Sequence, residues 1–276
     1  MKLGGNKMKK GFLWGVIGLS AIFLSGCGGS NETEDKYDTI KEAGVIKVAT
    51  SPDYAPFGFH TTIDGKDQIV GADIDLVEAI GEKMGVEVEW LDMSFNNVLA
   101  ATKEGKADIA VSAISVTDER EESFDFTTDY YTSPQVIVIN KNNQEVLNSI
   151  ESLSDKKVGA QKGTIQENIV KNQLEGAQLV SIEKLPNIFI EVNSGSLDAL
   201  VVEKMVAESY VEQNPNLMIA EIPLESMKED SFSIAVPKGN PKLVEELDKL
   251  ISEMKENGEV EEMVNKNSEL MDTASE

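Results

Sequence analysis

The sequence predicts an α/β protein built as two lobes with a cleft between them. Short runs rich in β-branched residues alternate with segments whose apolar residues recur at helical spacing, and this alternation occurs in two successive series. Strand–helix–strand alternation of this kind builds parallel-rich sheets covered by helices. A chain of 276 residues, 41% of them hydrophobic, is long enough for two such lobes.

The first series begins with Val45–Ala49, a β-branched run expected to be a strand. In the helix that follows, Ile74, Val77 and Ile80 fall near one face. A later helix stops before Gly105, which is a helix-end signal. The expected strands of this series are 45–49, 86–90 and 108–116, and the expected helices are 73–84 and 95–104.

The second series follows Tyr130 and Tyr131, and it repeats the alternation without a strict sequence repeat. Its last helix is amphipathic and is ended by Gly258. The expected strands are 134–140, 157–161, 180–182, 198–202 and 231–237, and the expected helices are 164–174, 187–194, 203–213 and 241–255.

The first 27 residues have the organisation of an export signal. Lysines open the segment, an apolar run covers 11–23, and Leu24-Ser25-Gly26 precedes Cys27, the only cysteine of the chain. A run this short does not span a bilayer comfortably, since spanning takes ~20 apolar residues. We expect a lipoprotein signal peptide over 1–26, lipidation of Cys27 and a flexible tether over 27–36, which would anchor the body at the outer face of the cell membrane. The alternative is a plain secretory signal with an incidental cysteine.

Charge and composition exclude several classes of function. The formal net charge is −24, and loss of the four lysines in the signal segment would bring the body near −28. Such a charge repels nucleic acid, so no nucleic-acid partner is expected. A single cysteine cannot form a disulfide framework. Because no His/Cys cluster occurs, neither a metal ion nor a cofactor is expected.

Six segments in order resemble a known family over nearly the whole body: ATSPDYAPFGF (49–59), VGADIDLVEAIGEKMG (70–85), ADIAVSAISVTDERE (107–121), FTTDYYTS (126–133), VGAQKGTIQE (158–167) and LDALVVEK (197–204). The family is that of the bacterial extracellular solute-binding proteins, family 3, the substrate-binding lipoproteins of polar amino acid ABC transporters. The resemblance implies a periplasmic-binding-protein-like fold of type II, in which two crossing strands join the lobes. It implies lobe 1 over 37–132, lobe 2 over 133–230, and a return to lobe 1 with a C-terminal helix over 231–276.

An amino acid's carboxylate needs cationic or N–H donors, and the resemblance assigns this role first to Arg120. A guanidinium offers a planar fork that matches a carboxylate. The alternative is an exposed arginine paired with Asp118 or Glu121. Ser115 is implied as a second donor, whereas Thr117 is expected to cap the helix that begins at Asp118. Where relatives often have serine or glycine, this chain has Ala113, whose carbonyl would still serve the ammonium.

The far lobe is expected to complete the carboxylate pocket with Thr164 and the backbone amide of Ile165, at a helix N-terminus. Thr164 and Glu167 also fit a capping box, which is a purely structural role. Glu203 follows an apolar strand and is the expected ammonium partner, since α/β clefts lie at strand ends. Many relatives have aspartate there. The alternative for Glu203 is an exposed first-turn helix residue.

Tyr54 and Phe95 match positions at which relatives hold the ligand side chain between rings, which suits a guanidinium. Gln161 is a candidate for reading the ligand side chain. Ser51 stands where some binders of basic amino acids carry an acid, and Asp53 is close but by alternation points away.

Three hypotheses follow. The first is a monomeric binding protein that closes on a polar, arginine-like amino acid and presents it to a membrane permease, with glutamine or cystine as alternative ligands. The second is an extracytoplasmic dehydratase on the same scaffold, with Glu203 as general acid and the sole histidine, His60, facing solvent. The third is a sensor module. The first is favoured, so no enzymatic activity is expected.

Overall fold

The computed structural model describes residues 34–273. The predicted signal peptide, Cys27 and the tether up to residue 33 lie outside the described residues. Helix α1 (Lys36–Ala43) begins at the last residue of the predicted tether. None of the helices within 34–273 is long and apolar enough to cross a membrane.

The first sheet has five strands in the order β5-β1-β6-β15-β7. Strand β1 pairs in parallel with β5 and β6, whereas β15 runs antiparallel to β6 and β7 and comes from much later in the chain. The strands are β1 (Val45–Thr50), β5 (Glu87–Asp92), β6 (Ile109–Ala110), β7 (Phe124–Phe126) and β15 (Ala235–Pro237). The helices around this sheet include α2 (Ala72–Met84), α3 (Phe95–Lys103), the short α4 (Asp118–Glu121) and α8 (Pro241–Glu256). We call this part lobe 1.

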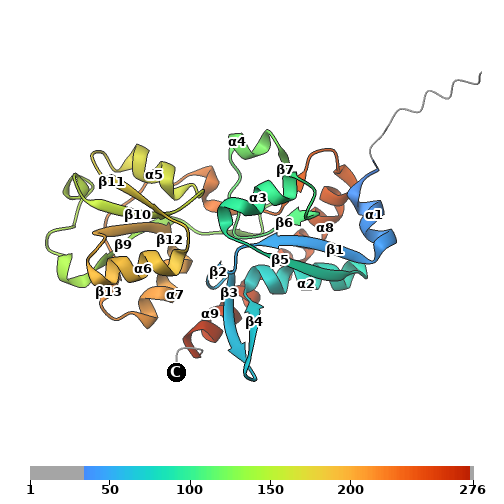
Figure 1. The fold of residues 1–276 in the computed structure, drawn as a ribbon, viewed down its shortest axis with the longest axis horizontal. Coiled ribbons are helices and arrows are strands. Elements are labelled where there is room, and N and C mark those ends of the chain that lie inside the picture. Colours follow the sequence, from blue (N-terminus) through green and yellow to red (C-terminus); the bar gives the residue numbers. More distant parts are fainter. Residues whose placement is uncertain (1–33, 274–276) are drawn as a thin grey trace, which may run out of the picture. The chain divides into compact units, whose positions relative to one another are not determined.

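The second sheet has the order β11-β10-β12-β9-β13. Its strands are β9 (Gln135–Asn140), β10 (Lys157–Gln161), β11 (Gln178–Ile182), β12 (Ala199–Glu203) and β13 (Leu217–Ile219). Helix α5 (Gln166–Gln173) covers one face, and α6 (Leu185–Ser194) and α7 (Lys204–Gln213) lie on the other (Figure 1). Three 3-10 turns occur at η1 (Lys141–Asn143), η2 (Glu151–Leu153) and η3 (Lys228–Asp230). We call this part lobe 2, and the predicted two-lobed α/β class is confirmed.

A short antiparallel ladder lies where the chain passes between the two sheets. Strand β8 (Tyr131–Thr132) pairs with β14 (Ser231–Phe232), through the register Ser231↔Thr132 and Phe232↔Tyr131. Phe232 is fully buried, and its ring packs edge to face on the ring of Phe57, with 5.0 Å between the ring centres. The lobe boundaries at 133 and 230 stay predictions.

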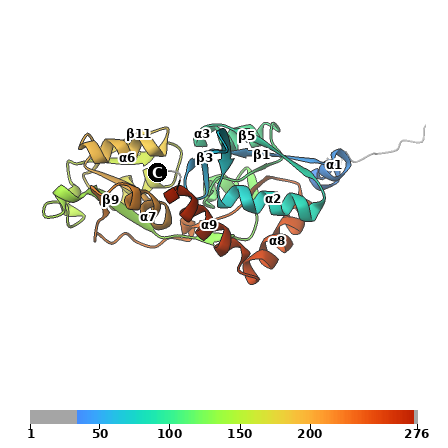
Figure 2. The same ribbon diagram turned by 90° about the horizontal axis from the view of Figure 1, so that it is seen from below.

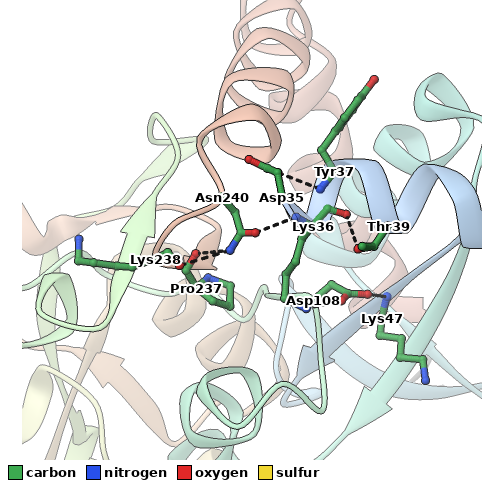
Figure 3. Close-up of polar contacts among 9 residues, drawn as sticks. All are labelled: Asp35, Lys36, Tyr37, Thr39, Lys47, Asp108, Pro237, Lys238 and Asn240. Carbon is green, nitrogen blue, oxygen red and sulfur yellow. Dashed lines mark hydrogen bonds and ion pairs between the residues drawn. The ribbon is translucent and has the colours of Figure 1, made fainter. Parts of the chain in front are cut away.

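Helix α1 contacts two parts of lobe 1 that are far apart in the sequence, near residues 108 and 240. The Asp35 side chain caps the helix by accepting from the Tyr37 N–H at 3.0 Å, and the Lys36 N–H donates to Asn240 Oδ1 at 2.8 Å, just before α8. The Lys36 ammonium also pairs with Asp108 at 2.7 Å (Figure 3). Long-range contacts therefore hold the first helix against the rest of lobe 1.

Among the elements that the sequence reasoning missed are a small sheet and the last helix. Strands β2 (Asp53–Tyr54), β3 (Gly58–Ile63) and β4 (Lys66–Val70) form a separate sheet, with Asp64 and Gly65 turning at positive φ between Ile63 and Lys66. Asp-Gly is a strong two-residue hairpin signal. Helix α9 (Glu259–Thr273) contacts both α2 and α7 (Figure 2).

Most predicted elements are confirmed within a few residues, and 157–161 coincides with β10. The single strand predicted over 108–116 is wrong, since only Ile109–Ala110 is a strand. Ala113 has a φ of 46°, a left-handed conformation that interrupts extended backbone. The strand predicted over 231–237 is likewise two short strands, β14 and β15.

Helix α2 begins against the backbone that precedes β3. Carbonyls of Pro56 and Phe57 accept from the N–H groups of Ala72 and Asp73, both at 2.9 Å. These bonds satisfy helix donors that lack intrahelical acceptors. The approach requires Gly71, which has a φ of 140° and on which a Cβ would lie 2.0 Å from the Phe57 carbonyl oxygen.

Gly71→Ala is therefore expected to destabilise the protein far more than Gly44→Ala. Gly44 has a φ of 70° but nothing within 4 Å of an added Cβ. Its substitution should cost only the left-handed backbone penalty of about 1–2 kcal/mol, whereas Gly71→Ala must displace backbone atoms and should cost more than twice as much. Urea unfolding of both variants measures this, and equal losses would contradict the close approach.

Candidate functional site

One cavity is lined by residues of both lobes. All nine residues predicted to bind a ligand line it, together with two that were not predicted, Ser112 and Gln166. The lining residues are Tyr54, Phe95, Ser112, Ala113, Ser115, Arg120, Gln161, Thr164, Ile165, Gln166 and Glu203.

The residues converge because they follow the carboxyl ends of parallel strands. In lobe 1, Tyr54 comes after β1 and Phe95 begins α3 after β5. In lobe 2, Gln161 and Glu203 are the last residues of β10 and β12. Ligands of open α/β sheets bind outside these strand ends. The fold therefore brings together residues that are far apart in sequence.

Arg120 is the only arginine of the chain and stands on the short helix α4. As predicted, Thr117 caps this helix and accepts from the Arg120 N–H at 3.2 Å. The guanidinium donates to the carbonyls of Ser115 at 2.6 Å and Gly163 at 3.1 Å, and its Cζ lies 5.6 Å from the centre of the Phe95 ring. It is partly buried, and desolvation lowers the pKa of Arg120 to about 10.

Within residues 34–273, Arg120 forms no ion pair, and Asp118 pairs with Lys228 at 2.7 Å instead. The alternative of an exposed arginine paired with a neighbouring acid is therefore wrong. A guanidinium carries five N–H donors, and the two hydrogen bonds go to neutral carbonyls. The cation keeps the capacity to bind a carboxylate.

Glu203 is 2% exposed, so the alternative of an exposed helix residue is also wrong. The Tyr54 hydroxyl of lobe 1 donates to Oε2, and Gln166 Nε2 donates to Oε1 at 2.7 Å. Burial raises the pKa of Glu203, and the hydrogen bond from Tyr54 opposes this rise. In the described part of the chain no cation lies within ion-pair distance of this carboxyl group, which suits it to an incoming ammonium.

The predicted capping box at Thr164 is wrong. Helix α5 begins two residues later at Gln166, and the Thr164 hydroxyl donates to the Gln161 carbonyl at 2.7 Å. Glu167 instead accepts from the Gly163 N–H at 3.0 Å, because Gly163 turns the chain back with a φ of 86°. Thr164 and the backbone of Ile165 still line the cavity at the start of the helix.

Two carboxylates that sequence reasoning did not single out as site residues support the cavity. Asp73 Oδ2 accepts from the Ala113 N–H at 2.8 Å and its Oδ1 accepts from the Tyr130 hydroxyl at 2.7 Å. The first bond holds Ala113 in its left-handed conformation against the cavity. Asp53 was expected to point away, and it does not line the cavity, but its carboxylate accepts from Gln161 Nε2 at 3.0 Å. Both contacts join residues distant in sequence, so no local pattern indicates them.

Gln166 had a local signal, because it stands next to Thr164 and Ile165 in the segment GTIQE. It donates to Gln135 Oε1 at 2.8 Å as well as to Glu203.

Among residues 34–273 no group of His, Cys, Asp and Glu side chains is arranged to hold a metal ion. The polar groups of the cavity therefore suit a small ligand that carries both charges.

The model of the bacterial extracellular solute-binding proteins, family 3, matches residues 46–269. The chain belongs to this family. It is 33% identical over 260 residues to a probable histidine-binding protein of Campylobacter jejuni and 34% identical over 263 residues to the arginine-binding extracellular protein ArtP of Bacillus subtilis, each match covering 94% of this chain and 98% of the relative.

A crystal structure of the amino acid ABC transporter substrate-binding protein AbpA from Streptococcus pneumoniae, bound to L-arginine, superposes with a TM-score of 0.81. Its sequence is 43% identical, and the match covers 86% of this chain and 98% of that chain. The resemblance carried by the six sequence segments is thereby confirmed.

The pH dependence of stability tests the role of Asp73. Burial raises the pKa of this carboxyl group from 3.8 to about 7. Folding therefore disfavours its charged form, and the resulting destabilisation is absent below about pH 4, grows as the pH rises and is complete above pH 7. In Asp73→Asn, Oδ1 accepts from Ala113 and Nδ2 donates to Tyr130, so the geometry is kept. We expect the variant to gain stability over the wild type between about pH 5 and pH 8 in urea unfolding. Parallel curves would contradict the buried charge.

Proposed function

We propose that the protein is the substrate-binding protein of an amino acid ABC importer and captures a basic, arginine-like L-amino acid. The observation that supports this most is the presence of Arg120 and Glu203, each without a charged partner in the described chain, in one cavity. A zwitterionic ligand supplies one carboxylate and one ammonium, which are the missing partners.

In this proposal the α-carboxylate binds the Arg120 guanidinium, with Ser115 and the Ile165 N–H as further donors. The Thr164 hydroxyl would join them by turning away from the Gln161 carbonyl, to which it donates in the structure. The α-ammonium binds Glu203 or the carbonyl of Ala113. A carboxylate one methylene longer than aspartate reaches further into the cavity, so Glu203 could also contact a ligand side chain. A ligand ammonium that replaced the donors from Tyr54 and Gln166 would favour the charged form of Glu203. It would therefore oppose the rise in the pKa of Glu203 that desolvation causes.

Three features favour a basic side chain. Tyr54 and Phe95 present rings to the cavity, and cations stack favourably on such rings. The buried Oε1 of Gln161 has no hydrogen-bond partner within 34–273 and offers an acceptor. The relatives named above are a probable histidine-binding protein, an arginine-binding protein and a substrate-binding protein with L-arginine bound. Serine at position 51, in place of an acid, keeps glutamine and cystine as alternative ligands.

Binding would proceed by closure of the lobes, because several contacts cross between them. Arg120 of lobe 1 donates to Gly163 of lobe 2, and Tyr54 donates to Glu203. A Cβ added to Gly163 would lie 3.3 Å from Cβ of Asn96. A ligand that closes the lobes must bind the closed arrangement better than the open one.

The closed, monomeric protein would then meet a membrane permease. We propose that lipidation at Cys27 holds it at the outer face of the cell membrane. We infer a binding protein without enzymatic activity, because the relatives named above are named as amino acid-binding or substrate-binding proteins.

A thermal-shift screen against the twenty amino acids, ornithine, citrulline and cystine tests this function. Ligand at a hundredfold excess over its Kd stabilises by about 2.7 kcal/mol. We expect shifts with arginine, lysine or ornithine. Shifts confined to glutamine or cystine would contradict the basic ligand, and no shift on protein refolded to strip bound ligand would favour the dehydratase or sensor hypotheses.

Arg120→Ala is expected to abolish the ligand-induced thermal shift, because it removes the carboxylate fork. Lys106→Ala removes an exposed cation of the same lobe and serves as the matched control, with an unchanged shift. Arg120→Lys keeps a charge without the planar fork and should bind weakly. An unchanged shift in Arg120→Ala would contradict the assignment of the carboxylate site.

Glu203→Gln is expected to move stability and binding in opposite directions. Because burial raises the pKa of Glu203, the neutral amide should stabilise the ligand-free protein at neutral pH. Loss of the charge should weaken arginine binding by at least about tenfold. Urea unfolding without ligand and calorimetric titration with arginine measure the two effects. A variant that binds arginine as tightly as the wild type would contradict the ammonium site.

A further inference from the structure

The side-chain amide of Gln161 is held with a defined direction. Gln161 ends β10, is 2% exposed and lines the cavity. Its Nε2 donates to Asp53 Oδ2 at 3.0 Å and to the Glu183 carbonyl at 3.2 Å, so both N–H groups are used. Neither Asp53 nor Glu183 lines the cavity. The NH₂ group therefore points away from the ligand space.

The two acceptors also determine which end of the amide faces them. If the amide were rotated, Gln161 Oε1 would meet a carboxylate and a carbonyl oxygen, which are both acceptors. In the observed orientation Oε1 is buried and has no hydrogen-bond partner among residues 34–273. An unsatisfied buried acceptor is costly. A ligand that donates an N–H to this atom would remove that cost.

The Asp53 carboxylate is held by two further donors, neither of which lines the cavity. Its Oδ1 accepts from the Ser51 hydroxyl at 2.8 Å, and its Oδ2 accepts from the N–H of Leu185, the first residue of α6, at 3.3 Å. Asp53 lines a separate groove with Lys184 and Tyr210. It stands on β2, joined to lobe 1, whereas Gln161 and Leu185 belong to lobe 2.

We propose that Asp53 is a positioning residue that sets the polarity of the ligand site, by holding the Gln161 amide so that only its oxygen is presented to the cavity. The site then selects side chains that end in N–H donors and disfavours side chains that end in a carbonyl or carboxylate. Because Asp53 reaches Gln161 across the lobes, the side chain is read in the closed arrangement. This inference rests on the proposed amino acid binding.

The test is the ratio of Kd values for L-citrulline and L-arginine, measured by calorimetric titration. The two ligands have the same length, but citrulline carries a terminal carbonyl in place of one N–H donor group. In Asp53→Ala only the Glu183 carbonyl still opposes rotation of the amide, and a rotated amide can donate to the citrulline carbonyl. We expect the Kd ratio of citrulline to arginine to fall by about tenfold. Asp53→Ser, whose side chain is too short to reach Gln161, should behave alike and replaces Asp53→Ala if that variant does not fold.

Three further variants separate positioning from charge. In Asp53→Asn, Oδ1 accepts from Gln161 and Leu185 while Nδ2 donates to Ser51, so the wild-type ratio should be kept. Gln161→Met lacks the amide, and adding Asp53→Ala to it should change the ratio no further. Asp67→Ala removes an exposed carboxylate from strand β4 of the same small sheet and is the control for net charge.

An unchanged ratio in Asp53→Ala and Asp53→Ser would overturn the inference while leaving amino acid binding intact. A loss of selectivity in Asp53→Asn equal to that in Asp53→Ala would show that Asp53 acts by charge, and would also overturn it. Wild-type protein that binds neither ligand would contradict the proposed function itself.

Discussion

The cavity combines a buried carboxyl group and a partly buried guanidinium that do not pair with each other, and this arrangement constrains the rest of the site. Glu203 interacts with neutral donors and Arg120 with neutral carbonyls. Desolvation raises the pKa of the first and lowers the pKa of the second. Water or a ligand must supply the missing electrostatic partners. An L-amino acid carries both of them on one carbon atom.

Each lobe supplies one of the two charges, so the cavity depends on contact between the lobes. Arg120 reaches Gly163 and Tyr54 reaches Glu203, and each contact joins a residue of lobe 1 to a residue of lobe 2. Asp73 and Asp53 stand behind this first layer. Asp73 holds the backbone of Ala113, and Asp53 holds the amide of Gln161. Two residues of the cavity are thus oriented by carboxylates that do not line it.

The strands and most helices could be predicted from the sequence because their signals are local: β-branched runs, helical spacing and glycine stops. The nine cavity residues could be predicted because they follow strand ends in segments that resemble the family. Asp53, by contrast, meets a residue 108 positions away, and Asp73 meets one 40 positions away, so no local pattern indicates either contact. The left-handed φ of Ala113, which ends the predicted strand 108–116, depends on that second contact. The hairpin at Asp64-Gly65 had a local signal, whereas in α9 the buried Asn267 interrupts the apolar spacing.

A crystal structure of the protein with L-arginine would show whether an amino acid binds between Arg120 and Glu203. We expect the α-carboxylate within hydrogen-bond distance of the Arg120 guanidinium and the α-ammonium within hydrogen-bond distance of Glu203 or the Ala113 carbonyl. The guanidinium of the ligand should lie near Gln161 Oε1. A ligand whose carboxylate lies away from Arg120, or one bound outside the cavity shared by the two lobes, would contradict it.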